Sequence, residues 1–489
     1  MTATAAIRKK RRQGSRAADL TEEQQAAYVA AADFIEGDDR EMVIAGAAGT
    51  GKTTVIGHVV KALVRRGLKV AITAPTNKAV GVLSQKTREA VGDHCPNVWV
   101  GTIHALLGLK PELDERHGRQ FLRQSGRPKT EEGMVIVVDE CSMVDQNLLL
   151  YIRAESAKIG AKVLYVGDWY QLPPVFERAS MTFDVPLWVN LTQVIRQAKD
   201  NPILSLATEI REVLDGAAFP VIETQKRRGL GVEVLRPREF ERALKRHFLS
   251  KDYDTDPNHC RALCWTNGRV HEYNQRIRRW ILGEEAKRPY VAGEVVSAVR
   301  PIVQDERVLV PTDGYSTILE VVRLPGDHGF DVWELTLDHR DEEILVHVPA
   351  DWEAYKTAMG DLARAAQELQ RQVKDRGKAG LSVPESLDKE RRAAWRAFFE
   401  FQHTYADLRS PHSTTVHKSQ GSTYQVAFID LTDIGRNTKS YELTRLLYVA
   451  ITRAAQKVFV TGELPARLYA CEEFTEPPEL SEETTELYA

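Results

Sequence analysis

The chain has 489 residues and a net charge of −3 at pH 7, with 28% charged and 43% hydrophobic residues. This composition is ordinary for a globular protein and excludes a polycation or a disordered chain. The length predicts about three domains. If the chain binds nucleic acid, it must use a localised groove rather than bulk charge.

The five cysteines are scattered, and Cys260 and Cys264 have no companions at zinc-ligand spacing. This pattern favours a reducing compartment and small buried hydrophobic side chains over disulfides or a metal site. No apolar run reaches membrane-spanning length, and the N-terminus has no apolar signal core. We therefore expect a cytoplasmic protein.

The chain opens with residues 1–19, which contain the basic run RKKRR and predict a disordered tail. Residues 20–190 follow, with the apolar runs MVIAGAA, KVAITAP, GMVIVVDE and AKVLYVGD separated by helical stretches. Each run is near-continuously apolar, as strands buried on both faces must be. The segment therefore predicts an α/β unit around a parallel sheet.

An inserted segment interrupts this unit at residues 108–131. Residues 108–124 alternate around a His-Gly turn, which predicts a β-hairpin.

A second α/β unit is expected over residues 191–289 and 406–465. It is interrupted by close-spaced strands at 290–351, which predict a small β-barrel. Residues 352–405 follow, with apolar positions in alternating three- and four-residue steps, which predict a coiled-coil-like arm of two antiparallel helices. Residues 466–489 predict a flexible acidic tail.

A phosphate-binding loop occupies residues 46–53, which read GAAGTGKT between an apolar strand and a helix. We expect Lys52 to reach the β- and γ-phosphates of ATP and the Thr53 hydroxyl to bind Mg²⁺. Glycines let backbone N–H groups converge on the phosphates. The candidate nucleotide-binding residues are Gly46, Ala47, Ala48, Gly49, Thr50, Gly51, Lys52, Thr53 and Thr54.

Two carboxylates follow the buried strand VIVV at its C-terminal end. Asp139 is expected to hold Mg²⁺, directly or through water, and Glu140 to orient and deprotonate the attacking water. A kinase would not need that second carboxylate, so the pair favours hydrolysis. Taken alone, the same residues would be a solvated acidic turn.

Further segments resemble, in the right order, the motifs of superfamily 1 DNA helicases, most closely the bacteriophage Dda and bacterial RecD-like branch. The resemblance covers roughly residues 20–465 and implies two RecA-like P-loop NTPase lobes. Its segments are LTEEQ, APTNKA, TIHA, GDWYQLPPV, LTQVIRQ, CWTN, TTVHKSQGSTY and LYVAITRA.

The resemblance implies nucleotide-side roles for six further residues. Gln24 would sense adenine, although Thr21 and Gln24 also read as a helix capping box. Gln171 would sense the γ-phosphate, and Arg196 and Arg453 would be arginine fingers that stabilise charge when the cleft closes. The two remaining residues, which face the cleft, are Gln420 and Gly421.

The resemblance also implies contacts to the DNA backbone. Small hydroxyl and amide groups at loop ends suit phosphate contacts without base reading. The candidate DNA-binding residues are Pro75, Thr76, Asn77, Thr102, His104, Asn267, Thr415, His417 and Lys418. In this family an inserted hairpin acts as the pin that splits the duplex, and residues 108–124 stand at its place.

Together these features predict an ATP- and Mg²⁺-dependent helicase that acts on single-stranded DNA and single-strand/duplex junctions. The resemblance implies 5′-to-3′ travel. We also expect a monomer that works in replication, repair or recombination, with the tails or the arm as sites for protein partners. Two alternatives remain open: a translocase or RecD-like subunit that does not unwind alone, and an ATP-gated binding switch. An RNA track is also compatible with backbone contacts.

Overall fold

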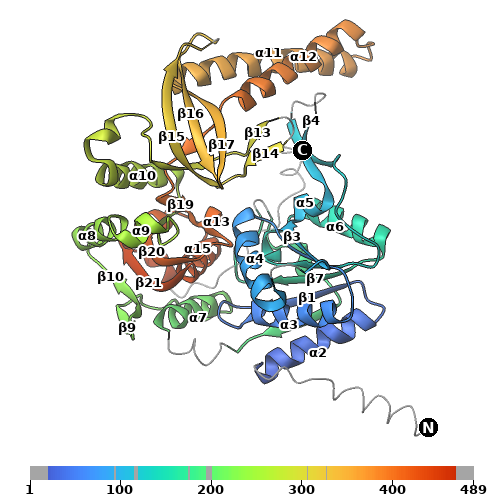
Figure 1. The fold of residues 1–489 in the computed structure, drawn as a ribbon, viewed down its shortest axis with the longest axis vertical. Helices are drawn as coiled ribbons and strands as arrows, with labels where there is room; N and C mark the ends of the chain where they lie inside the picture. The colour runs from blue at the N-terminus through green and yellow to red at the C-terminus, as the bar shows by residue number, and fades with distance from the viewer. Residues whose placement is uncertain are drawn as a thin grey trace.

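A computed structural model describes residues 20–92, 95–114, 119–174, 177–193, 201–304, 307–326 and 328–469. Figure 1 shows two α/β lobes side by side, with a β-rich unit and two long helices above them. The predictions for residues 1–19 lie outside the described residues. No helix in the described ranges is long and apolar enough to cross a membrane.

The first lobe is built on a six-stranded parallel sheet in the order β3-β2-β6-β7-β1-β8. Alternate residues of one strand enter opposite cores, since Met42 and Ile44 belong to one buried cluster and Val43 to the other. This two-sided burial explains the unbroken apolar runs. The strands are β1 (Glu41–Gly46), β2 (Val70–Ala74), β3 (Val98–Thr102), β6 (Val135–Val138), β7 (Lys162–Gly167) and β8 (Leu187–Leu191).

The helices of the first lobe begin where strands end. Thr76 follows β2 and Thr102 is the last residue of β3, and each caps the next helix by accepting a hydrogen bond from the N–H three residues on. The polar ends of several strands therefore meet at one edge of the sheet. The helices are α2 (Glu22–Glu36), α3 (Lys52–Arg65), α4 (Asn77–Val91), α5 (Ile103–Leu107) and α6 (Gln146–Ile159), with short 3₁₀ turns η1 (Cys141–Met143) and η2 (Met181–Phe183).

The second lobe repeats this plan with the strand order β19-β11-β20-β21-β10-β9, in which the edge strand β9 is antiparallel. Its strands are β9 (Gln225–Arg227), β10 (Leu230–Val234), β11 (Cys260–Cys264), β19 (Ser413–Thr415), β20 (Tyr424–Asp430) and β21 (Ala454–Thr461). Its helices are α7 (Pro202–Leu214), α8 (Pro237–Phe248), α9 (Lys251–Thr255), α10 (Asn267–Leu282), α13 (Val416–Ser419), α14 (Leu431–Ile434) and α15 (Ser440–Thr452). The predicted α/β class with two lobes is confirmed.

A five-stranded antiparallel sheet lies above the second lobe, in the order β17-β16-β15-β12-β18 (Figure 1). The edge strand β18 lies within residues 406–465, which the sequence predicts to be part of the second lobe. Leu408 of β18 instead pairs with Ala298 of β12. The second lobe therefore resumes only after this strand. The elements are η3 (Gly283–Lys287), β12 (Val295–Ala298), the hairpin of β13 (Ile302–Gln304) and β14 (Arg307–Val310), β15 (Tyr315–Leu324), β16 (Val332–His339), β17 (Glu342–Pro349) and β18 (Leu408–Arg409).

Two helices, α11 (Trp352–Lys378) and α12 (Glu385–Thr404), form the arm. Ala366, Trp395 and Phe399 pack between them, and a separate cluster around Phe330 and Phe401 joins the arm to the five-stranded sheet. The inserted segment of the first lobe holds a two-stranded antiparallel hairpin, β4 (Leu109–Asp114) and β5 (Arg119–Gln124).

The start of the acidic tail differs from the prediction. Ala466–Leu468 form a 3₁₀ turn, η4, and Leu468 is buried in the core of the second lobe. Tyr469 packs edge-on against Phe219. Apolar anchoring therefore extends the folded lobe to residue 469, and the rest of the predicted tail lies outside the described residues.

Candidate nucleotide cleft and nucleic-acid groove

The phosphate-binding loop has the tight turn that its glycines predict. Gly49 and Gly51 adopt φ angles of 81° and 79°, which side chains with a Cβ rarely tolerate. The Lys52 ammonium donates to the carbonyls of Gly46 at 2.5 Å and Ala47 at 3.1 Å. It therefore lies over the loop, beside the N-terminus of α3 where an anion is favoured.

The acidic pair stands directly after β6. Burial and the neighbouring Glu140 raise the pKa of Asp139 to about 7, while Lys52 opposes the shift. Glu140 has a φ of 51°, a left-handed conformation that costs roughly 1–3 kcal/mol in a residue other than glycine and concentrates at functional sites. Its N–H donates to Asp139 Oδ1 at 3.0 Å.

The residues at this edge of the sheet fit a bound Mg²⁺. A hydroxyl from Thr53 and a carboxylate from Asp139 are hard oxygen ligands, and Mg²⁺ commonly takes few protein ligands together with phosphates and water. Groups of three or more His, Cys, Asp or Glu side chains suited to a metal are absent from the described ranges. Two protein ligands would leave the other positions around an octahedral Mg²⁺ to phosphates and water.

The segment that carries Gln171 lies against the second lobe. Arg445 Nη1 of α15 donates to the Gln171 carbonyl at 2.9 Å. Gln420 Nε2 donates to the Leu172 carbonyl at 3.2 Å. The structure thus brings Gln171 and Gln420 together, and the Gln171 side chain is itself buried, with its Oε1 unpartnered.

The hydroxyl of Tyr448 makes a third connection between the lobes. It donates to Asp168 Oδ2 at 2.5 Å and accepts from the Ala48 N–H of the phosphate-binding loop at 2.9 Å. Tyr448 and Asp168 are 1% and 0% exposed. The nucleotide loop is therefore hydrogen-bonded to a helix of the opposite lobe.

The structure describes one of the two predicted arginine fingers. Arg453 is buried at the end of α15, where it donates to the carbonyls of Val449 and Ser422, both at 3.2 Å. It is therefore bound to its own lobe in this conformation. Arg196 lies outside the described residues.

Gln24 caps its helix and supports the loop. Its side-chain oxygen accepts from the Thr21 N–H, and the Thr21 hydroxyl accepts from the Gln24 N–H, which forms the predicted capping box. Its amide Nε2 donates to the Thr50 carbonyl at 2.9 Å. Both polar atoms of the side chain are engaged within the protein, so adenine recognition stays a prediction.

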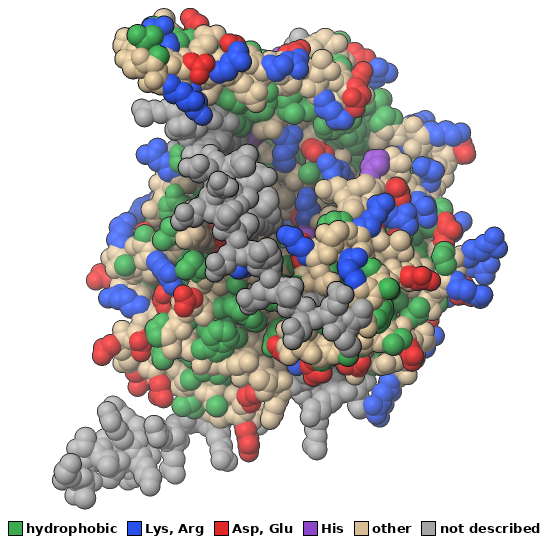
Figure 2. All heavy atoms as spheres, turned by 180° about the vertical axis from the view of Figure 1, so that it is seen from behind, with side chains coloured by type: hydrophobic (Ala, Val, Ile, Leu, Met, Phe, Trp, Pro, Cys, Tyr) green, Lys and Arg blue, Asp and Glu red, His purple; other side chains and the backbone are tan. Residues whose placement is uncertain are grey.

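A polar groove opens where the two lobes meet the five-stranded sheet. Four of its lining side chains are basic and one is acidic. Basic side chains are also visible in the hollow below the arm in Figure 2. The groove is lined by Lys78, Arg261, Asn267, Val270, Asn274, Ser297, Val299, Asp313, Tyr315, Arg409, Ser410, Pro411, Ser413, Thr414, Thr415 and Lys418.

Three predicted DNA-binding residues therefore come together: Asn267, Thr415 and Lys418. Asp433 fixes the first of them, because its carboxylate accepts from the Trp265 and Thr266 N–H groups at the start of α10. The Thr415 hydroxyl caps the short helix α13 by accepting from the Lys418 N–H. Helix caps thus place the polar ends of α10 and α13 in the groove.

The other predicted DNA contacts lie outside this groove lining: Pro75, Thr76, Asn77, Thr102, His104 and His417. Burial lowers the pKa of His104 and of His417, so both imidazoles are neutral near pH 7 and offer no charge to a phosphate. Thr76 still approaches the second lobe. A Cβ added to Gly421 would lie 3.3 Å from the Thr76 hydroxyl and 3.0 Å from the Ala79 Cβ, and Gly421 has a φ of 70°.

Sequence reasoning missed three residues of these sites: Lys78, Arg445 and Tyr448. Lys78 follows the predicted contact Asn77 and lines the groove. Arg445 and Tyr448 are polar side chains within the apolar run of α15, where burial makes a partner obligatory. That signal points to a partner without telling which lobe supplies it.

Comparison with known proteins gives two family matches. Residues 19–229 match the AAA domain, and residues 412–461 match the UvrD-like helicase C-terminal domain. The ATP-dependent DNA helicase dda of Enterobacteria phage T4 is 25% identical over 481 residues, covering 90% of this chain and 99% of that protein.

A second relative is the ATP-dependent RecD2 DNA helicase of Deinococcus radiodurans, 34% identical over 205 residues, which cover 41% of this chain and 24% of that protein. The crystal structure of Pif1 helicase from Candida albicans has 16% identity and a TM-score of 0.43, over 91% of this chain and 94% of that one. Three findings point to the same kind of protein: the order of the two matched domains, the match along almost all of dda, and the phosphate-binding loop. These matches identify the chain as a superfamily 1 helicase similar to Dda and RecD2, and it is an ATP-dependent DNA helicase.

Proposed function

We propose that this chain is a motor that hydrolyses ATP to move along single-stranded DNA from 5′ to 3′ and to unwind duplex DNA ahead of it. The observation that carries the proposal is the segment 413–421. Thr415 and Lys418 line the groove, and Gln420 contacts the loop of the nucleotide cleft. Because one short segment contacts both places, movement at the cleft would be transmitted to the groove.

Hydrolysis would take place at the edge of the first sheet. Lys52 would leave its loop carbonyls to hold the β- and γ-phosphates, and Glu140 would accept a proton from the attacking water. Mg²⁺ held by Thr53 and Asp139 would neutralise charge on the phosphates. The left-handed backbone of Glu140 supports this role, because such strain is maintained where a side chain must be aimed.

The second lobe would complete the site on closure. Arg453 and Arg196 would stabilise charge that develops on the transferred phosphoryl group. Gln171 would report the presence of the γ-phosphate, since its backbone already contacts Arg445 of the opposite lobe. Hydrolysis would then depend on the position of the lobes, as a motor requires.

The DNA strand would run through the groove, with its phosphates on the basic and hydroxyl side chains. Asn267, Thr415 and Lys418 form one part of this track, and the polar ends of α4 and α5 would extend it across the first lobe. The Dda and RecD2 relatives are named as DNA helicases, which supports DNA as the track. The direction rests on the resemblance to that branch.

The test compares ATP turnover with and without single-stranded DNA for the wild type, Glu140→Gln and the control Glu132→Gln. Glu132 is an exposed carboxylate before β6, so its substitution makes the same charge change outside the site. We expect DNA to stimulate the wild type and the control at least about tenfold. Glu140→Gln should lose about 100-fold or more of that rate, as expected for loss of a general base.

Turnover that ignores DNA in the wild type would contradict the motor and favour an ATP-gated switch. Full activity of Glu140→Gln would remove that residue from the mechanism.

A further inference from the structure

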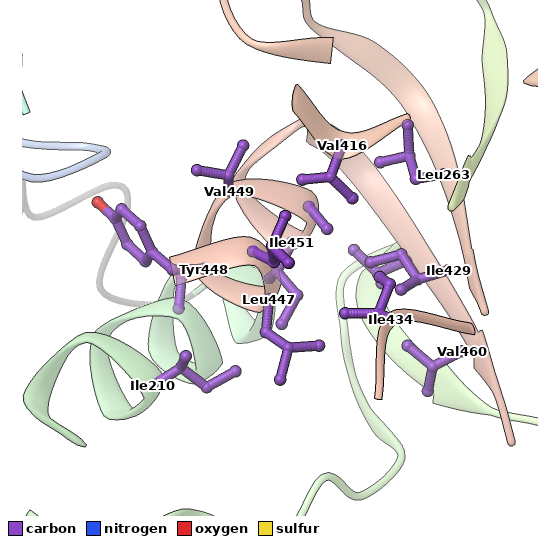
Figure 3. Close-up of a cluster of buried hydrophobic side chains, with 14 of the residues drawn as sticks. Ile210, Leu263, Val416, Ile429, Ile434, Leu447, Tyr448, Val449, Ile451 and Val460 are labelled. Atoms are coloured by element: carbon purple, nitrogen blue, oxygen red, sulfur yellow. The ribbon is translucent and has the colours of Figure 1, made fainter. Parts of the chain in front are cut away.

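The hydroxyl of Tyr448 occupies a position that packing alone does not explain. The ring belongs to the buried cluster of the second lobe, together with Ile210 and Leu447. Figure 3 shows Tyr448 at the margin of this cluster, with its hydroxyl directed away from the strand residues Ile429 and Val460. The ring therefore fills the core of one lobe, while the oxygen reaches into the other.

Both hydrogen-bonding capacities of this hydroxyl are used across the lobe boundary. It donates to Asp168 and accepts from the Ala48 N–H, 400 residues away in the sequence. Burial and the Asp168 carboxylate raise the pKa of Tyr448 well above its ordinary value, so the phenol remains a protonated donor. Asp168 uses its other oxygen to accept from the Tyr170 N–H at 3.0 Å.

Each partner leads to a different part of the nucleotide site. The Ala48 peptide lies inside the phosphate-binding loop, next to the Ala47 carbonyl that Lys52 contacts. Asp168 begins the loop that continues to Gln171. Tyr448 itself lies on α15, which Arg453 directly follows. One oxygen atom thus connects the three elements that handle the phosphates.

The hydrogen bonds that Arg445 and Gln420 make across the lobe boundary go to a different segment. Arg445 and Gln420 both donate to carbonyls of the loop that carries Gln171. Separation of the lobes would leave the Ala48 N–H and the buried Asp168 carboxylate without their partner at the same time. Loss of this oxygen therefore affects the phosphate-binding loop and the loop that carries Gln171 together.

We propose that Tyr448 is a positioning residue that couples the phosphate-binding loop to the second lobe. Its hydroxyl holds the Ala48 peptide and the Asp168 carboxylate in register with α15, so that the loop reaches its hydrolytic shape only when the lobes are aligned. The inference rests on the proposed function, because it assumes that lobe alignment controls hydrolysis.

The test uses the full-length chain with Tyr448→Phe and the matched control Tyr165→Phe. Tyr165 is also a fully buried phenol that donates to a carboxylate, Glu41 at 2.8 Å, but both partners belong to the first lobe. Tyr448→Phe should lower kcat of the DNA-stimulated ATPase about tenfold and change KM for ATP less than about twofold. This is the effect expected when one hydrogen bond to a charged group is lost and that bond aligns the site for hydrolysis rather than for ATP binding.

Tyr165→Phe should leave kcat and KM within about twofold, although both variants should lower the melting temperature. If Tyr448→Phe matches this control while the wild type is DNA-stimulated, the positioning role is wrong. A wild type without DNA stimulation would instead contradict the proposed function.

A double-mutant cycle separates positioning through Asp168 from independent effects. We expect Asp168→Asn alone to lower kcat, and the double variant with Tyr448→Phe to be no slower than the slower single variant. Effects on kcat that multiply would show that the two side chains act separately and would overturn the coupling.

Discussion

Asp313 is the acidic side chain of a groove whose other charged lining residues are basic. Its Oδ1 lies 4.0 Å from the Lys418 ammonium. Burial works against the charge of Lys78, but Tyr424, Tyr315 and Asp313 hold the pKa of this lysine above its ordinary value. The carboxylate thus stands between two lysines, where a backbone phosphate would be attracted.

Removal of this carboxylate should therefore strengthen DNA binding. Asp313→Asn is expected to tighten binding of single-stranded DNA about two- to fivefold at low salt, since one exposed charge pair contributes roughly 0.2–1 kcal/mol. Fluorescence anisotropy with a labelled oligonucleotide measures the change. The control Glu320→Gln makes the same charge change on β15. Equal or weaker binding by Asp313→Asn would show that Asp313 orders the lysines rather than competes with DNA.

At the residue scale, prediction from sequence succeeded where the geometry is local. The turn at Gly49 and Gly51 and the capping box at Gln24 depend on neighbours within a few residues, and both are present. The partners of Tyr448 and Arg445 lie 400 and 274 residues away. No local pattern encodes such contacts, so the roles of these residues could be found only in the folded chain.

At the element scale, the parallel strands could be predicted because two-sided burial leaves an unbroken apolar run. The elements that the sequence pattern did not predict are short. β18 has two residues and η4 has three, and each is held by tertiary contacts rather than by its own pattern. The hairpin β4–β5 is anchored at its base, where Gln124 donates to the Leu107 carbonyl and Tyr151 to the Leu122 carbonyl.

This hairpin is predicted to be the pin that separates the strands. Replacing residues 110–123 by a short Gly-Ser turn should abolish unwinding of a tailed duplex. It should leave the DNA-stimulated ATPase within about twofold, because the Gln124–Leu107 hydrogen bond at the base of the hairpin and the nucleotide cleft are retained. A strand-displacement assay and an ATPase assay on the same preparation measure both, and unwinding that survives the deletion would exclude the hairpin as the pin.

At the scale of the whole molecule, the lobes are joined at two places with different chemistry. At the cleft, buried hydrogen bonds connect the lobes through Tyr448, Arg445 and Gln420. At the groove, each lobe instead places a lysine against the start of β15: the Lys78 Nζ lies 5.6 Å from the centroid of the Tyr315 ring, and the Lys418 ammonium lies 4.0 Å from Asp313. This division suits a motor in which the nucleotide sets the lobe position and the DNA backbone is gripped or released in response.

The most direct test of this account is displacement of streptavidin from single-stranded DNA biotinylated at either end. A motor that moves from 5′ to 3′ should displace streptavidin from the 3′ end when ATP is present. It should leave the 5′ block in place, and Glu140→Gln should displace neither. Displacement from the 5′ end would reverse the proposed direction, and ATP turnover without displacement from either end would contradict the motor itself.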